Sequence, residues 1–140
     1  MSEMNIVKTI FLKAPPEHVW KFLTEADRLA EWFHRGGADL VEGGDYTLLT
    51  NSYGKEGEKL LYGKVLEANK PERLVHTFTH EWLKGVETTC TWTLEGVGGG
   101  TVLTLVHEGW DKVDEDGFGM AADHDKGWDE HFARLRSVTS

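Results

Sequence analysis

His107 is the side chain in this 140-residue sequence that is best placed for acid–base chemistry. It stands beside Glu108 at the end of a predicted strand, and the ordinary pKa of an imidazole lies near neutrality. A buried core histidine with satisfied hydrogen bonds is the competing interpretation, because no partner carboxylate can be placed next to its ring. Other side chains could orient a bound molecule through a hydroxyl, an imidazole or an indole N–H: Tyr46, His76, Trp92 and Trp128. Catalysis is therefore left open, with His107 as the candidate acid or base.

The spacing of the histidines argues against a metal site. His76 and His80 are four residues apart on a predicted strand, roughly 13 Å, which is too far for two ligands of one zinc ion. His124 and His131 are seven residues apart on a predicted helix, so they lie about 10 Å from each other. Asp123, His124 and Asp125 could hold a cation weakly, although a solvated acidic helix start explains them better. The sequence predicts no metal and no cofactor.

Phosphate, calcium and nucleophile chemistry are not predicted either. The glycine run Gly96–Gly100 lacks the Gly-Lys-Ser/Thr ending of a phosphate loop and precedes a strand, so it is typical of a hairpin turn. The acidic segment Asp111–Asp116 lacks the ligand spacing and the terminal Glu of a calcium loop. Cys90 alternates with threonines and has no basic neighbour in the sequence, which indicates a small buried wall residue.

Composition limits the class of protein. The length suits one domain over residues 1–140, and the formal net charge of −9 disfavours a nucleic-acid partner, because its phosphates would be repelled. Uninterrupted apolar runs stop at three residues, far short of a membrane span. The first residues lack the regions of a secretion signal, and the lone Cys90 cannot form an intramolecular disulfide, so we expect a cytoplasmic protein. The 6 Trp, 6 Phe and 3 Tyr require a large apolar interior.

The N-terminal part predicts a strand and two short helices that close one end of this interior. Residues 9–13 alternate between polar and apolar, and Pro15-Pro16 then suits the first turn of a helix with Trp20 on its apolar face. Thr24 is the predicted cap of a second helix, which Gly36-Gly37 ends. The apolar face of this second helix holds Leu29, Trp32 and Phe33.

The central part predicts five or six antiparallel strands, because side chains alternate and short turns separate the runs. The predicted connections are the turns Gly43-Gly44-Asp45, Asn69–Glu72 and Gly96–Gly100 and the hairpin connection Asn51–Glu58. The predicted inward side chains are Tyr46, Leu48, Val65, Phe78, Cys90, Trp92, Leu103, Leu105 and His107.

The C-terminal part predicts one longer helix, starting near Met120–Asp123, that faces these strands. Its apolar stripe holds Trp128, His131, Phe132, Leu135 and Val138. Gly127 lies inside this pattern, where glycine costs about 1 kcal/mol relative to alanine, and close approach to a neighbour would explain it. Asp111–Gly119 is acidic and loop-like, and the acidic stretch Asp111–Asp116 is interpreted as a flexible lid over a pocket mouth, carrying Trp110 and Phe118.

Several short motifs also occur in a definite order along nearly the whole chain. They are Ala14-Pro15-Pro16-Glu17-His18-Val19-Trp20, Trp32-Phe33, Gly63–Glu67 with Pro71–Val75, Thr89–Leu94, Gly99–Leu105, His107–Trp110, and Gly127-Trp128 with Leu135. This order resembles the activator of heat-shock protein 90 ATPase homologue-like family, in the START-like, or SRPBCC, superfamily. The resemblance implies a helix-grip fold of the α+β class, in which a curved antiparallel sheet wraps a long C-terminal helix and leaves a cavity between them.

The resemblance implies three functions, and fold alone does not choose between them. Our leading prediction is a soluble binding protein for a small aromatic or lipid-like molecule. The alternatives are a cofactor-independent enzyme of the polyketide cyclase or hydrolase type, with His107 as base in the same cavity, and a chaperone-associated regulator in the stress response. A monomer or a homodimer is expected, the dimer through Tyr62 and Leu66 on the outer sheet face.

The predicted ligand-binding residues combine the inward strand positions, the facing helix and the lid. They are Trp20, Trp32, Phe33, Tyr46, Leu48, Val65, Phe78, Cys90, Trp92, Leu103, Leu105, His107, Trp110, Phe118, Trp128 and Phe132.

Overall fold

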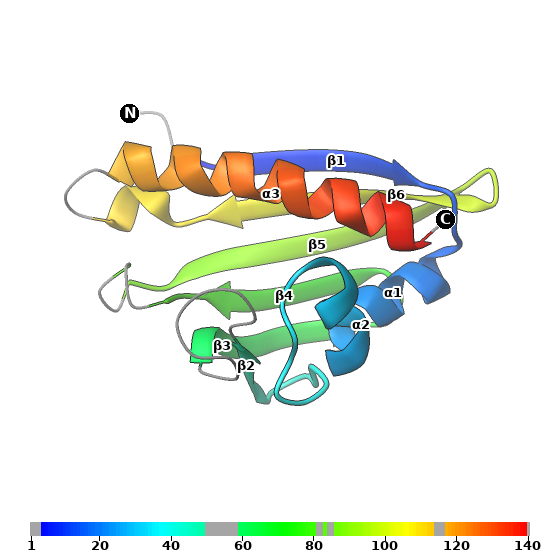
Figure 1. The fold of residues 1–140 in the computed structure, drawn as a ribbon, viewed down its shortest axis with the longest axis horizontal. Coiled ribbons are helices and arrows are strands. Elements are labelled where there is room, and N and C mark those ends of the chain that lie inside the picture. Colours follow the sequence, from blue (N-terminus) through cyan, green and yellow to red (C-terminus); the bar gives the residue numbers. More distant parts are fainter. Residues whose placement is uncertain (1–3, 50–58, 81–82, 84–85, 114–116, 140) are drawn as a thin grey trace.

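An antiparallel sheet packed against helices makes up the described part of the chain, residues 4–49, 59–80, 83, 86–113 and 117–139 of a computed structural model (Figure 1). The elements in chain order are β1 (Ile6–Leu12), α1 (Pro16–Thr24), α2 (Ala26–Trp32), β2 (Asp45–Leu49), β3 (Lys59–Asn69), β4 (Arg73–Phe78), β5 (Thr88–Val97), β6 (Gly100–Glu108), the short 3-10 helix η2 (Trp110–Lys112) and α3 (Gly117–Thr139). The sheet order is β1-β6-β5-β4-β3-β2.

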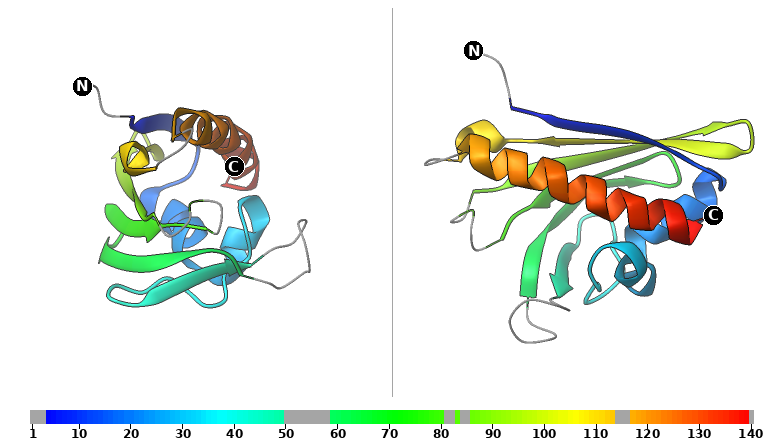
Figure 2. Two further views of the ribbon diagram at one scale, coloured as in Figure 1. Left: turned by 90° about the vertical axis from the view of Figure 1, so that its left-hand side faces the viewer. Right: turned by 45° about the horizontal axis from the view of Figure 1, so that its top comes forward.

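The helices occupy one side of a strongly curved sheet. Figure 2 shows α3 lying along the concave side, with α1 and α2 on the same side near the C-terminal end of α3. This is the START-like helix-grip arrangement that the sequence predicts, and it places the inner face of the sheet toward the helices.

Alternation along the strands explains how that inner face is built. Cys90 pairs with His107 and Trp92 with Leu105 across β5 and β6, so the apolar positions of both strands fall on the same side. All four side chains are buried, as are Tyr46 and Leu48 of β2. The predicted inward face is therefore confirmed at these positions.

Gly63 marks the place where the sheet bends. A Cβ at Gly63 would clash with the backbone carbonyl of Thr77 on β4, so only glycine fits the close approach of the two strands. The β3–β4 register shifts between Val65 and Glu67, two residues farther along β3. A bulge of this kind bends and twists a strand, which helps the sheet to curve around α3.

The predicted cap of the second helix is wrong. Thr24 is buried at the end of α1, where its hydroxyl donates to the Trp20 carbonyl at 3.0 Å. The Ala26 N–H of α2 instead donates to the Asp39 carboxylate at 2.8 Å. The helix also ends at Trp32 rather than at Gly36-Gly37, and Gly36 then pairs with Leu48 at the edge of the sheet.

The segment predicted as a flexible lid is ordered where the structure describes it. Trp110 is fully buried in η2, and α3 begins at Gly117 rather than near Met120. Phe118 is 75% exposed in the first turn of α3. The prediction of a lid that carries Trp110 is therefore wrong, because this ring belongs to the core; Asp114 to Asp116 and the predicted Asn51–Glu58 connection lie outside the described residues.

The described helices offer no candidate for a membrane span. The longest, α3, carries acidic and basic side chains along much of its length.

Candidate ligand-binding cleft

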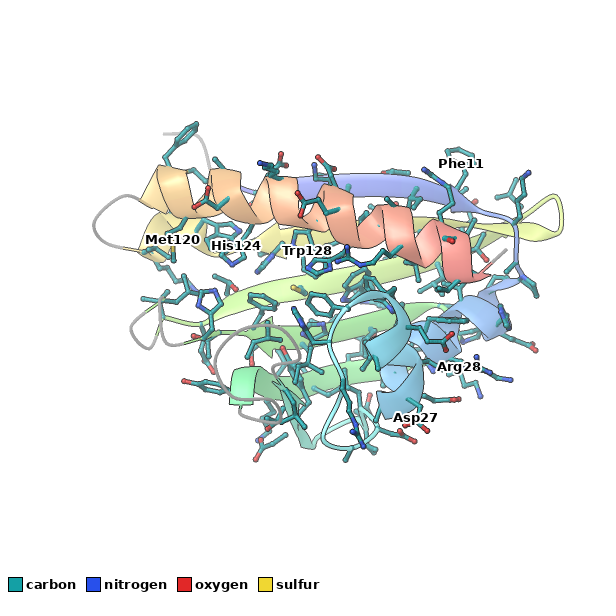
Figure 3. The ribbon with its side chains drawn as sticks, viewed as in Figure 1. Phe11, Asp27, Arg28, Met120, His124 and Trp128 are labelled. Carbon is teal, nitrogen blue, oxygen red and sulfur yellow. The ribbon has the colours of Figure 1, made fainter. Side chains whose placement is uncertain are left out.

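A cleft of about 180 Å³ opens between α3, the end of β4 and the residues that follow α2. Its lining residues are Phe33, His34, Leu61, Phe78, His80, Asp123, His124, Gly127, Trp128 and His131. Figure 3 shows His124 and Trp128 projecting from α3 toward the sheet. Phe11 of β1 instead points outward, away from the interior. The cleft is therefore walled by rings from three separate elements.

The space deeper between sheet and helix is almost filled. A cavity of about 20 Å³ remains there, enough for a single water-sized occupant. Its lining residues are Leu23, Leu29, Trp32, Phe33, Leu40, Tyr46, Leu48, Leu61, His76, Phe78, Trp92 and Trp128. Phe33, Leu61, Phe78 and Trp128 line both spaces, so the cleft is the mouth of this interior.

The predicted ligand-binding residues separate into three groups. Those that line the cleft or the deeper cavity are Trp32, Phe33, Tyr46, Leu48, Phe78, Trp92 and Trp128. Those buried in the core without lining either space are Trp20, Val65, Cys90, Leu103, Leu105, His107, Trp110 and Phe132. Phe118 lies on the surface and lines neither.

The aromatic walls pack against one another in the geometries that rings prefer. Phe33 stacks on Trp128 with centroids 5.1 Å apart, and Trp92 meets Trp128 edge to face at 5.5 Å. Phe78 lies 6.2 Å from Trp128 on the opposite side of the cleft mouth. These contacts hold the apolar surface of the cleft in place.

Two tryptophan–histidine pairs satisfy the polar groups of the interior. The Trp92 indole N–H donates to His76 Nε2 at 2.9 Å, and the Trp128 indole N–H donates to His107 Nδ1 at 3.1 Å. Since an indole nitrogen only donates, these contacts fix the tautomer of each imidazole. His76 then donates from Nδ1 to the Thr77 carbonyl at 2.9 Å.

His107 is fully occupied by its neighbours. Its Nε2–H donates to the Thr88 hydroxyl at 2.7 Å, and that hydroxyl donates to the Phe78 carbonyl. Burial, reinforced by His124, His76 and His80, holds the pKa of His107 well below its ordinary value, so the ring is neutral. The core-histidine interpretation describes this geometry, which leaves neither ring nitrogen for acid–base work.

The polar groups of Tyr46 and Cys90 also lie in the interior, where Tyr46 is hydrogen-bonded and Cys90 is fully buried. The Tyr46 hydroxyl contacts the Thr77 carbonyl and His76, and burial raises its pKa well above the ordinary value. Cys90 is completely buried, and burial raises the pKa of its thiol. A protonated, buried thiol is a small apolar group rather than a nucleophile.

His80 and His124 meet across the cleft. Their Nε2 atoms are 2.9 Å apart, and the ring planes are within 3° of each other with centroids at 5.1 Å, so the rings lie edge to edge. His124 donates from Nδ1 to the Met120 carbonyl at 2.8 Å, which leaves a lone pair on its Nε2 for an N–H of His80. Burial lowers the pKa of His80 to about 4 and also lowers that of His124, so both rings are neutral near pH 7.

Gly127 serves the cleft rather than a close helix contact. An added Cβ would meet nothing within 4 Å, so the predicted close approach to a neighbour is wrong. Together with His124 and His131, Gly127 lies on the face of α3 that lines the cleft. The sequence contained a signal for this face, the spacing of three and four residues from His124 through Gly127 to His131.

Neither a metal site nor the groove beside α1 is a stronger candidate than the cleft. No group of three or more metal-binding side chains gathers among the residues that the structure describes. A wider groove of about 550 Å³ lies beside α1, lined by Pro15, Glu17, His18, Lys21, Lys70 and Pro71. It is open, half of its lining residues are charged, and it lacks the aromatic walls of the cleft.

Comparison with known proteins places the chain by family and by fold. A family model described as "Activator of Hsp90 ATPase homolog 1-like protein" matches residues 13–140. No curated protein sequence matches the chain.

Solved structures share this fold over most of the chain. CalU16 from Micromonospora echinospora is 25% identical, with a TM-score of 0.77 over 97% of this chain and 76% of that one. Protein MLL2253 from Mesorhizobium loti is 20% identical, with a TM-score of 0.80 over 96% and 95% of the two chains. PFC0360w from Plasmodium falciparum, described as an HSP90 activator, is 25% identical, with a TM-score of 0.62 over 75% and 72%.

Proposed function

The chain belongs to the activator of Hsp90 ATPase homolog 1-like family, and from that premise we propose that it binds a small, flat, apolar molecule in the cleft between α3 and the sheet. The observation that carries this proposal is the cleft itself, about 180 Å³ between Phe33, Phe78 and Trp128. A cavity of about 150 Å³ in another protein holds benzene, so one aromatic ring fits here.

The polarity of the cleft supports an apolar guest. The indole N–H groups of Trp92 and Trp128 are already bonded to histidines, so the inner wall presents ring faces rather than free donors. Removing apolar surface from water contributes about 25 cal/mol per Å², and rigid aromatic walls favour flat guests. Affinity therefore comes from burial of the ring against Phe33, Phe78 and Trp128.

The two other functions expected from the sequence find less support. An enzyme with His107 as general base would need a ring nitrogen that faces a substrate, and both nitrogens of His107 are bonded inside the core. A chaperone-associated role is suggested by the printed description of PFC0360w, which concerns that protein. The cytoplasmic location and the choice between monomer and homodimer stay predictions.

A cavity-filling substitution tests the proposal. Toluene is titrated into 15N-labelled protein, and the dissociation constant is read from the shift of the Trp128 indole N–H signal. Gly127→Leu places a side chain into the open space of the cleft, so we expect toluene affinity to fall at least about tenfold. Ala122→Leu, on the exposed face of the same helix, is the matched control and keeps wild-type affinity.

Two results would contradict the proposal. One is wild-type protein that shows no saturable toluene binding. The other is equal affinity in wild type and Gly127→Leu, with the far-UV circular dichroism of the variant unchanged, because binding would then lie elsewhere.

A further inference from the structure

His131 differs from the interior histidines in how its ring nitrogens are used. It lines the cleft from α3, and its ring stands edge to face against Phe33 at 4.6 Å. Within the described part of the chain, His131 meets polar atoms through Nδ1: the Arg134 guanidinium lies 2.6 Å away and the Trp32 carbonyl 3.4 Å away. The Nε2 side of the ring is thus left for the cleft.

Arg134 determines which nitrogen of His131 carries the proton. Arg134 Nη2 lies 2.6 Å from His131 Nδ1, and a guanidinium can only donate. Nδ1 must therefore offer its lone pair to Arg134, and the proton of the neutral ring sits on Nε2. The Trp32 carbonyl only accepts, so at 3.4 Å it is a contact of Nδ1 and not a hydrogen-bond partner. Arg134 is itself anchored, because its Nε donates to the Trp32 carbonyl at 3.2 Å.

The ring stays neutral at physiological pH. Burial, with added repulsion from His34 and the Arg134 charge, lowers the pKa of His131 to about 4. Asp123 is the acidic side chain among the lining residues of the cleft, and together with the formal net charge of −9 it disfavours an anionic guest. The cleft thus combines aromatic walls, the neutral Nε2–H of His131 and an unfavourable field for anions.

We propose that the Nε2–H of His131 selects, among flat apolar molecules, those that carry a neutral hydrogen-bond acceptor beside the ring, such as an aryl ketone. This inference rests on the proposed function, because it names the class of guest that the same cleft prefers. On binding, the His131 Nε2–H exchanges a hydrogen bond to water for one to the guest. Its net contribution therefore corresponds to at most about a tenfold tighter binding of a guest with the acceptor than of one without it.

A pair of isosteric probes tests the selectivity separately from binding. Acetophenone and α-methylstyrene have the same shape, and they differ by a carbonyl oxygen in place of a methylene group. Both are titrated by 15N NMR into wild type, His131→Leu and His131→Gln, and the ratio of the two dissociation constants is compared between proteins. The hydration of each probe is the same throughout, so it cancels in this comparison.

The expected result is a shift in the ratio. In His131→Leu, the preference for acetophenone over α-methylstyrene should fall by a factor of about three to ten, and α-methylstyrene should still bind. His131→Gln retains an N–H donor and should keep part of the preference. Arg134→Met removes the donor to His131 Nδ1, so this nitrogen can take the proton from Nε2. The variant should therefore weaken the preference for acetophenone, although residue 134 is not among the residues that line the cleft. His18→Leu, at a histidine outside the cleft, is the control and should keep the wild-type ratio.

Failure of the inference and failure of the proposed function give different results. If both probes bind and the ratio is the same in wild type and His131→Leu, the role of His131 is overturned and the binding function stands. If neither probe binds wild type, the proposed function is overturned and the inference with it.

Discussion

At the scale of single residues, the interior is held together by imidazoles that must stay neutral. His76 accepts from the Trp92 indole on one side and donates to the Thr77 carbonyl on the other, so a second ring proton would have to displace an indole donor. The ring is buried, and burial lowers its pKa from 6.5 to about 4. His80, His107 and His131 are shifted in the same direction. Together they link the stability of the fold to pH.

The sign of this dependence follows from the unfolded state. Between pH 6.5 and about 4, the unfolded chain protonates His76 while the folded protein does not, so stability falls as pH falls through this window. His76 alone accounts for about 3 kcal/mol over the whole window. We expect the free energy of unfolding, measured with urea, to fall strongly between pH 7 and pH 4.5 in wild type and to fall less in His76→Gln.

The control for this prediction is a histidine outside the interior. His18 lies on α1 at the outer groove, outside the buried histidine contacts of the interior, so His18→Gln should keep the wild-type loss of stability between the two pH values. Equal losses in wild type and His76→Gln would mean that the titration of His76 does not contribute to the pH dependence.

At the scale of elements, short helices depend on partners outside their own sequence. The N-terminus of α2 is capped by Asp39, thirteen residues beyond Ala26, although Thr24 stands at the position that local sequence favours. Thr24 is held by α1 because its buried hydroxyl finds the Trp20 carbonyl one turn back. The position of α2 matters for the cleft because Phe33 follows its last residue.

Removing the cap should therefore destabilise the protein. We expect Asp39→Ala to lower the free energy of unfolding by about 1 kcal/mol, because one N–H at the start of α2 loses its acceptor. Asp39→Asn keeps a side-chain oxygen and should lose less. Urea unfolding at pH 7 measures both variants, and a loss in Asp39→Asn as large as in Asp39→Ala would show that charge rather than capping matters.

How much could be predicted from sequence depends on whether a feature is local. Alternation in β5 and β6 placed Cys90, Trp92 and His107 on the inner face correctly, because that pattern is contained within each strand. The histidine rim of the cleft could not be found in this way. His80 and His124 touch although 44 positions separate them, and spacing along one strand or one helix cannot report a partner on another element.

The same limit explains the error in the predicted pocket. Rings on the inner face were expected to leave a hollow, whereas Trp32, Trp92 and Phe132 interlock and fill most of the depth. Close packing of this kind is a property of the assembled core. The space that survives lies at the mouth, where Gly127 contributes no side chain.

At the scale of the whole molecule, α3 is tied to different parts of the fold along its length. Lys8 of β1 forms ion pairs with Asp125 and Asp129, His80 bonds to His124, and Arg134 reaches the carbonyl at the end of α2. The cleft lies among these contacts, so any opening of the fold that separates α3 from the sheet also opens the cleft. The β5–β6 hairpin turn lies far from the cleft, at the right-hand edge of Figure 1.

Hydrogen exchange in the presence of a guest therefore distinguishes the cleft from other surfaces. A guest at ten times its dissociation constant stabilises the guest-bound native protein by about 1.4 kcal/mol. Amides that exchange only through an opening that releases the guest should then exchange about tenfold more slowly. With saturating toluene we expect this slowing at residues 33–34, 78–80 and 123–131, the segments that contain most of the residues lining the cleft. Amides of the Gly98–Gly99 turn should exchange by local opening at an unchanged rate. Slowing confined instead to residues 15–21 and 70–71 would place the guest in the groove beside α1 and contradict the assignment of the cleft.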